Sequence, residues 1–350
     1  TPSSHGTAAP RPFWRIELTE MARLGAPIVF TQLAWVAMLT TDTAMIGRLG
    51  PDALAGASLS LMIFFLTWVF CFGVIMATAA LASQAFGARK PRMIRRVIRQ
   101  GFWATIVLTV PAMIAFRYTP DLLGLLSQPP EILPHADAYM STLMWCLIPS
   151  IGFAVVRNFI SSLNRPTPAL WVMLAGVPLN GLLDYALIFG NFGLPRLELV
   201  GAGIATSIVN WLMFLVLLAI AVFAKPFRRY AILGRFWRPD WFQFRQIFRI
   251  GLPIAAMSLL EAGFFFSAIF IVGQFGAHAI AATMIALQMP HITFMVPMGL
   301  GQAATVRVGQ AVGRRDTEGA YRSGWVAVSI ALVFMSVMTA IVLSLPETFA

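Results

Sequence analysis

Three acidic residues interrupt long apolar runs of this 350-residue chain, and acids in such places are the first candidates for chemistry. Asp42 lies in "WVAMLTTDTAMIGRLG", Asp184 in "VPLNGLLDYALIFG" and Glu261 in "LLEAGFFFSAIF". A carboxylate at the centre of a membrane helix costs about 2.5–3.5 kcal/mol on insertion scales, so such acids usually face a cavity or a partner. All three are therefore candidates for binding a proton or a cation.

The composition places these acids in a membrane protein. Hydrophobic residues make up 59% of the chain and charged residues 11%, whereas soluble domains have about 25% charged residues. The net charge of +11 could indicate a nucleic-acid partner, but the charge is confined to short gaps between apolar runs, so we expect none. The two cysteines fit no disulfide or metal pattern, and we assign them to packing.

The apolar runs predict an all-α membrane bundle. A bilayer core of about 30 Å requires roughly 20 apolar residues per helix. Nine runs meet this requirement: 22–47, 53–84, 94–117, 135–160, 167–190, 200–224, 247–275, 279–307 and 319–345.

The basic residues predict the orientation. Of the 25 Lys and Arg residues, 22 fall at the N-terminus or in the even-numbered gaps, if Arg157 and Arg165 are counted with the fourth gap. Because cytoplasmic loops are enriched in Lys and Arg, we expect a cytoplasmic N-terminus in a multi-pass protein of the inner (plasma) membrane.

The chain also contains an internal repeat. A shift of 226 residues aligns Gly25 and Pro27 with Gly251 and Pro253, and later Gln84 with Gln310, without a gap. Six spans separate the copies, so the repeat is parallel, as in transporters with two lobes. We therefore expect a cytoplasmic segment 1–20, a six-helix first lobe 21–224, a basic linker 225–246, and three helices of an incomplete second lobe in 247–350.

Helix rise places two of the acids at one depth. At about 1.5 Å per residue, Asp42 lies about 30 Å along the first span and Asp184 about 25 Å along the fifth. Asn180 precedes Asp184 by one turn, and Thr206 and Tyr139 reach the same layer. Two carboxylates that share a dry site cannot both be ionised cheaply, so this group could hold a proton or Na⁺. The alternative places Asp42 at the headgroups.

Glu261 lies elsewhere. In the repeat it matches Trp35, about 10 Å closer to the cytoplasm than Asp42. Neighbouring phenylalanines could help it hold a cation such as Na⁺. The alternative is a buried glutamate bonded to another helix. His278 and His291 are interpreted as interfacial or core residues.

No motif indicates catalysis. The chain has no GxxxxGK[ST] sequence for ATP and no HExxH or GxSxG sequence, so we expect neither an enzyme nor a cofactor beyond a coupling ion.

Several segments together resemble the multidrug and toxic compound extrusion (MATE) family, in its NorM-like branch. They are "TDTAMIGRLGPDALAG", "VPLNGLLDYALIFG" with "GAGIATS", and "FMVPMGLGQAATVRVGQAVG", which echoes "FCFGVIMATAALASQAFG". One departure is Thr283-Met284, where many members carry His-Gln. The resemblance implies a two-lobed exporter that exchanges drug-like, often cationic compounds for Na⁺ or H⁺. It also implies coupling roles for Asp42, Asn180, Asp184 and Glu261, supported by Thr206 and Tyr139.

Two other functions compete with export. A flippase for lipid-linked precursors would favour a strongly cationic cavity, whereas most basic residues here lie in the gaps. A membrane scaffold has no need of embedded acids or a two-lobed repeat. We expect small-molecule substrates, a coupling cation, the bilayer as surroundings, and a monomer.

Overall fold

The computed structural model describes residues 13–125, 130–191, 193, 195–273 and 277–344. Within these ranges, the side chains of 13–15, 266, 268–270, 273, 277–289 and 343 are outside the description. The sequence predictions for His278 and for Thr283-Met284 fall on such residues.

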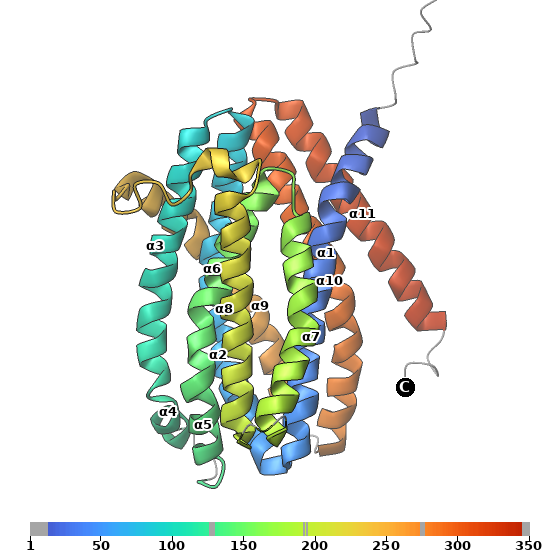
Figure 1. Cartoon of the computed structure of the whole chain (residues 1–350). Helices are drawn as coiled ribbons and strands as arrows, with labels where there is room; N and C mark the ends of the chain where they lie inside the picture. The colour runs from blue at the N-terminus through green and yellow to red at the C-terminus, as the bar shows by residue number, and fades with distance from the viewer. Residues whose placement is uncertain (1–12, 126–129, 192, 194, 274–276, 345–350) are drawn as a thin grey trace, which may run out of the picture.

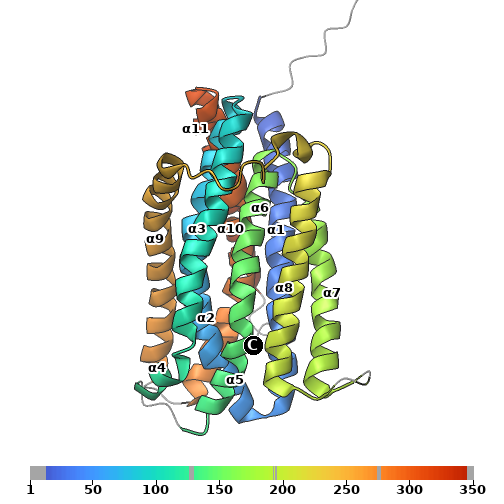
Figure 2. The same ribbon diagram turned by 60° about the vertical axis from the view of Figure 1, so that its left-hand side comes forward.

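The described residues fold as a bundle of long helices without a strand (Figures 1 and 2). The helices are α1 Phe13–Ile46, α2 Pro51–Gly87, α3 Pro91–Phe116, α4 Thr119–Leu125, α5 Leu133–Leu143, α6 Leu147–Ser162, α7 Thr167–Phe189, α8 Glu198–Phe223, α9 Trp241–Gly273, α10 Ala277–Gly313 and α11 Thr317–Ser344. Three 3₁₀ turns join them: η1 Gly47–Leu49, η2 Met144–Cys146 and η3 Phe227–Tyr230.

The helices match the predicted runs, with three corrections. Eight are long and apolar enough to cross a membrane, so the chain is a multi-pass membrane protein; for α10, the ninth, the side chains of 277–289 are undescribed. The first helix begins at Phe13, before the predicted start at 22, and α9 begins at Trp241, inside the predicted linker. The fourth run is α5, η2 and α6 in succession, because Pro149 has no N–H to continue the α-helical bonding through η2.

The basic residues gather at one end of the bundle. Figure 1 shows the start of α1 and the α2–α3, α8–α9 and α10–α11 connections together at the top, which we call the basic end. The α1–α2 and α7–α8 connections lie at the opposite end. Arg157 is an exception, because it lies within α6 and is only 6% exposed. Counting Arg157 with the fourth gap was therefore wrong.

The two parts of the repeat pack reciprocally. Helix α1 packs against α10, and α2 packs against α9. In the 226-residue register α9 is the counterpart of α1, and α10 is the counterpart of α2. Each contact is thus the symmetry mate of the other, as expected for two lobes related by an axis along the membrane normal.

Glycines reproduce this symmetry residue by residue. A methyl group added at Gly73 would overlap the backbone of Ala255, and one added at Gly299 would overlap the backbone of Val29. Gly299 is the repeat counterpart of Gly73, and Ala255 is that of Val29. The same exchange relates Gly87 with Gln310 to Gly313 with Gln84. The lobes therefore touch backbone to backbone at sites where only glycine fits.

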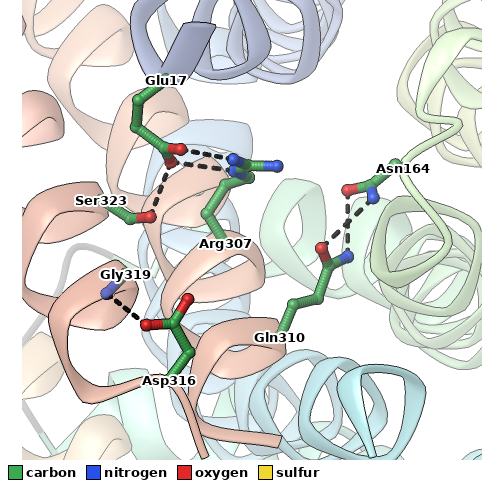
Figure 3. Close-up of polar contacts among 7 residues, drawn as sticks. All are labelled: Glu17, Asn164, Arg307, Gln310, Asp316, Gly319 and Ser323. Carbon is green, nitrogen blue, oxygen red and sulfur yellow. Dashed lines mark hydrogen bonds and ion pairs between the residues drawn. The ribbon is translucent and has the colours of Figure 1, made fainter. Parts of the chain in front are cut away.

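Polar bonds also join the lobes at the basic end (Figure 3). The Arg307 guanidinium on α10 donates to both carboxylate oxygens of Glu17 on α1, at 3.1 and 2.6 Å, and the Ser323 hydroxyl donates to Glu17 at 2.6 Å. The Gln310 and Asn164 amides donate to each other at 2.9 and 3.2 Å. We call the Glu17–Arg307 pair with Ser323 the basic-end latch.

A matched pair of glycines on α10 tests the close contact. Gly299 meets the α1 backbone, whereas Gly301 has open space where a methyl group would be. Alanine at an interior helix position gains roughly 0.5–1 kcal/mol over glycine, whereas overpacking costs about 1–3 kcal/mol. Gly299→Ala should therefore lower the unfolding temperature in detergent, and Gly301→Ala should leave it unchanged or raise it. Equal shifts for the two variants would contradict the backbone contact.

Candidate functional site

Four of the predicted site residues meet inside the first lobe. The Asn180 side-chain amide donates to a carboxylate oxygen of Asp42 on α1 and, at 2.9 Å, to Asp184 one turn along α7. The Thr206 hydroxyl on α8 lies 3.3 Å from the other Asp42 oxygen. Asp42 is only 4% exposed, so its side chain does not lie on the surface of the bundle. We call these four residues the carboxylate cluster.

The carboxylate cluster has more acceptors than donors. Asp184 Oδ1 and Asn180 Oδ1 are buried and have no hydrogen-bond partner. Thr206 has a single hydroxyl hydrogen, which can go to Asp42 at 3.3 Å or to the Ala202 carbonyl at 3.0 Å. Buried acceptors without donors are costly, so a proton or a cation at this cluster would lower the cost of burying these oxygens.

Tyr139, the fifth first-lobe residue, lies beside the cluster. Its ring on α5 is fully buried, and together with Asp42 and Thr206 it lines a cavity of about 360 Å³. We call this the first-lobe cavity because its lining residues come from first-lobe helices, apart from His291. No group of three or more His, Cys, Asp or Glu side chains forms a metal site among the described residues, so any ion here would rely on amide and hydroxyl oxygens as well.

Glu261 lies apart from the carboxylate cluster, as predicted from its depth. It lines a cavity of about 530 Å³ between the lobes, which we call the central cavity. Of its neighbouring phenylalanines, Phe265 lines the same cavity, whereas Phe264 is 71% exposed. Most of the Phe and Trp residues that line this cavity come from the first lobe.

A stack of aromatic rings joins the two cavities. The rings of Trp35 and Trp68 lie 5.3 Å apart at 14°, and Phe72 continues the stack 4.8 Å beyond Trp68. Trp35, Phe65 and Trp68 line both cavities, together with Ser150, Asn210 and His291. The two cavities therefore adjoin, and these aromatic rings lie at their boundary.

The wall of the central cavity follows the repeat. Seven pairs of residues 226 positions apart line it: Gln32 and Ser258, Trp35 and Glu261, Phe65 and His291, Trp68 and Phe294, Val69 and Met295, Phe72 and Met298, and Met76 and Gln302. The cavity thus lies on the pseudo-symmetry axis. The backbone positions are duplicated, whereas the side chains at them differ.

Sequence reasoning missed the polar residues of this wall other than Glu261, and four of them bear on its chemistry: Gln32, Arg157, His291 and Gln302. The sequence places Arg157 with the fourth gap, and it predicts an interfacial or core position for His291. The repeat register held the missing signal for three of the four. It aligns Gln32, His291 and Gln302 with positions that face the same axis.

Comparison with known proteins agrees with this architecture. The sequence profile of the MatE family matches residues 27–186 and again residues 253–350. The two matches begin 226 residues apart, which is the register of the internal repeat.

The chain belongs to the MatE family.

Curated relatives carry related names. The chain is 44% identical to the probable multidrug resistance protein NorM of Bradyrhizobium diazoefficiens, over 92% of the chain and 69% of that protein. It is 46% identical to the protein of the same name from Rhodopseudomonas palustris, over 94% and 69%. With the multidrug resistance protein NorM of Burkholderia vietnamiensis it shares 33% identity over 97% and 73%.

Solved structures of MATE transporters have the same fold. The eukaryotic MATE transporter AtDTX14 superposes with a TM-score of 0.86 at 20% identity, over 96% of the chain and 74% of that structure. An outward-facing multidrug resistance MATE transporter superposes with a TM-score of 0.82 at 22% identity, over 93% and 72%. MatE membership and this fold confirm the predicted all-α membrane protein, and identify it as a transporter rather than an enzyme.

A double-mutant cycle tests whether the Asn180 amide of this MatE-family protein holds the two carboxylates together. Asn180→Leu should lower the free energy of unfolding by about 2–4 kcal/mol, because hydrogen bonds to carboxylates are each worth about 1.5–3 kcal/mol. Adding Asp184→Asn should recover part of the loss, since it removes one of two carboxylates left without the amide. Denaturant unfolding followed by tryptophan fluorescence gives both values.

The control cycle pairs Asn180→Leu with Asp52→Asn. Asp52 is exposed in the first turn of α2, at the same end of the bundle. Effects at independent sites add, so this cycle should show no interaction energy. Additive effects for Asn180 and Asp184 would mean that the amide does not hold the two carboxylates together.

Proposed function

We propose that the chain is a secondary-active multidrug exporter, which exchanges drug-like, often cationic compounds for Na⁺ or H⁺. The supporting observation is the adjoining pair of cavities: an acceptor-rich carboxylate cluster beside an aromatic cavity that carries Glu261. The multidrug resistance names of NorM relatives, at up to 46% identity, favour the same function.

The central cavity suits flat, apolar cations. Planar rings can stack on Trp35, Trp68 and Phe72, and stacked or edge-to-face aromatic pairs contribute about 0.5–1.5 kcal/mol beyond the buried area. Ring faces also attract cations, and the carboxyl group of Glu261 lines the same cavity. Met295 and Met298 give the wall flexible side chains that repack around different shapes.

The carboxylate cluster is proposed as the coupling site. Its donor set of carboxylate, amide and hydroxyl oxygens fits either a proton on one carboxylate or a Na⁺ held by several oxygens, and Glu261 is a second candidate for Na⁺. A bound cation would supply the positive charge that the unpartnered oxygens of Asp184 and Asn180 lack.

The lobes provide the moving parts. Two lobes related by an axis along the membrane normal can rock about a central site, which gives access alternately from either side. In the described conformer the latch joins the lobes at the basic end (Figure 3). The close contacts at Gly87 and Gly313 also join them there. The protein would lie in the inner membrane. The distribution of Lys and Arg favours a cytoplasmic location for its basic end.

A lipid-linked precursor flippase is not favoured. Such a cargo carries phosphate groups, which would call for several cations in the cavity. Among the described residues that line the central cavity, Arg157 is the single Lys or Arg side chain, and the acidic residue Glu261 lines the same cavity.

Dye efflux from a drug-sensitive bacterial host tests the coupling residues. Asp42→Asn and Asp184→Asn should each reduce efflux of a cationic dye at least tenfold, because the amide cannot exchange a proton and binds Na⁺ more weakly. Glu261→Gln should impair cationic dyes more than uncharged ones. Varying the Na⁺ gradient at fixed pH then identifies the coupling ion.

Two exposed acids serve as controls for this experiment. Asp52→Asn and Asp121→Asn change the charge near the same end of the bundle without touching either cavity. Both should export at the wild-type rate. Wild-type efflux by all three cavity variants would refute the coupling assignment.

The basic-end latch can be opened by mutation. Glu17 and Arg307 have side chains only 7% and 14% exposed, and removing one partner of a buried pair is strongly destabilising. Glu17→Gln should therefore shift the population toward conformers open at the basic end by more than tenfold. Spin labels at the exposed positions Arg165 and Thr317, one in each lobe, report the change as longer distances.

An exposed ion pair provides the matched control. Glu318 pairs with Arg322 within α11, and its side chain is 70% exposed. Glu318→Gln removes the same kind of charge without separating the lobes, so the distance distribution should stay as in the wild type. If both variants behave alike, the latch does not hold the basic end closed.

A further inference from the structure

Arg157 is a buried charge in the wall of the central cavity. It lies in the middle of α6, is only 6% exposed and contributes to the cavity lining. Arginine keeps its charge in proteins, so burial here costs free energy unless something compensates it.

The described protein compensates this charge only in part. The Nη1 group donates to the Gln32 side-chain oxygen at 3.0 Å, and the guanidinium lies 5.5 Å from the centre of the Phe72 ring. The Nη2 group is buried without a hydrogen-bond partner. Among the described residues, no ion pair includes Arg157, and none includes Glu261, which lines the same cavity.

Two amides add further donors beside the guanidinium. The Gln32 amide nitrogen donates to the thioether sulfur of Met298 at 3.5 Å, and a thioether is a weak acceptor. Gln302 follows Met298 by one turn of α10, lines the same cavity and has a buried amide nitrogen without a partner. One face of the cavity is thus rich in donors and poor in acceptors, the reverse of the carboxylate cluster.

We propose that Arg157, Gln32 and Gln302 form a carboxylate-binding site in the central cavity. The ligand class is an aromatic compound with a carboxylate group, whose rings lie on the Trp68–Phe72 stack and whose oxygens accept from Nη2 and the amides. With Glu261 on the same cavity, compounds carrying both a carboxylate and an amine also fit. The inference rests on the proposed exporter function and assigns a binding group to one face of its cavity.

A carboxylate fits this site better than a phosphate. A guanidinium presents parallel N–H groups that match the two oxygens of a carboxylate. A phosphate carries more charge and generally needs more than one cation, whereas the rest of this wall is mainly aromatic rings and methionines. Met298 lies over the amide of Gln32 and has a flexible side chain, so it can move aside for the ligand.

Direct binding to the purified full chain in detergent tests the proposal. The probes are 2-naphthoate, its methyl ester and a naphthyl trimethylammonium ion, measured by equilibrium dialysis. Wild type should bind the acid at least tenfold more tightly than the ester. Arg157→Gln should raise the Kd of the acid at least tenfold, whereas the cation should bind at least as tightly, because a positive charge has left the cavity.

Further variants keep the test informative if Arg157→Gln does not fold. Arg157→Lys retains the positive charge but loses the parallel N–H groups of the guanidinium, and should weaken acid binding three- to tenfold. Gln302→Leu should weaken it by a similar factor. Arg99→Gln is the matched control, since Arg99 is equally buried but bonds the Arg235 carbonyl away from both cavities. It should bind all three probes like the wild type.

The outcomes separate the inference from the proposed function. If wild type binds neither the cation nor the acid, the exporter proposal fails with it. If the cation binds but the ester binds as well as the acid, or if Arg157→Gln leaves acid binding unchanged, the carboxylate site is refuted. Displacement of 2-naphthoate by millimolar chloride, at constant ionic strength in methanesulfonate, would identify a halide site and also refute it.

Discussion

Backbone contact between the lobes is the constraint on which the cavities depend. Where α1 meets α10 and α2 meets α9, glycines bring one helix against the backbone of the other. Larger side chains on the same helices cannot enter these contacts, so they lie on either side of them. The aromatic and polar residues of the central cavity are the ones that this close packing leaves between the lobes, at positions fixed by the same two-fold relation.

This arrangement gives a symmetric frame with asymmetric chemistry. Trp35 in the first lobe corresponds to Glu261 in the second, and Phe65 corresponds to His291, yet all four line the central cavity. The carboxylate cluster has no such counterpart in sequence, since position 268, which matches Asp42, is an alanine. The duplicated backbone therefore supplies two similar halves, and the different side chains on each half supply different chemical groups to the cavity.

Depth along a helix could be predicted from the sequence, but rotation about its axis could not. Asp42, Asn180 and Asp184 were grouped correctly, because rise per residue and one-turn spacing are enough to place them in one layer. Arg157 was misplaced because a cation near a helix end looks the same in sequence whether it faces headgroups or an interior cavity. The break at η2 depended on a local effect of Pro149 that a run of apolar residues does not reveal.

Under the proposed function, the distance between the two sites suggests how exchange can work without a long pathway. Asp42 and Trp35 are seven residues apart on α1, two turns or about 10 Å of one rigid element. The ring of Trp35 lines both cavities, so a cation at Asp42 and a cargo on the aromatic stack share a boundary. Coupling then requires only that the two ligands favour different positions of the same helix, which is a differential affinity of a two-state element.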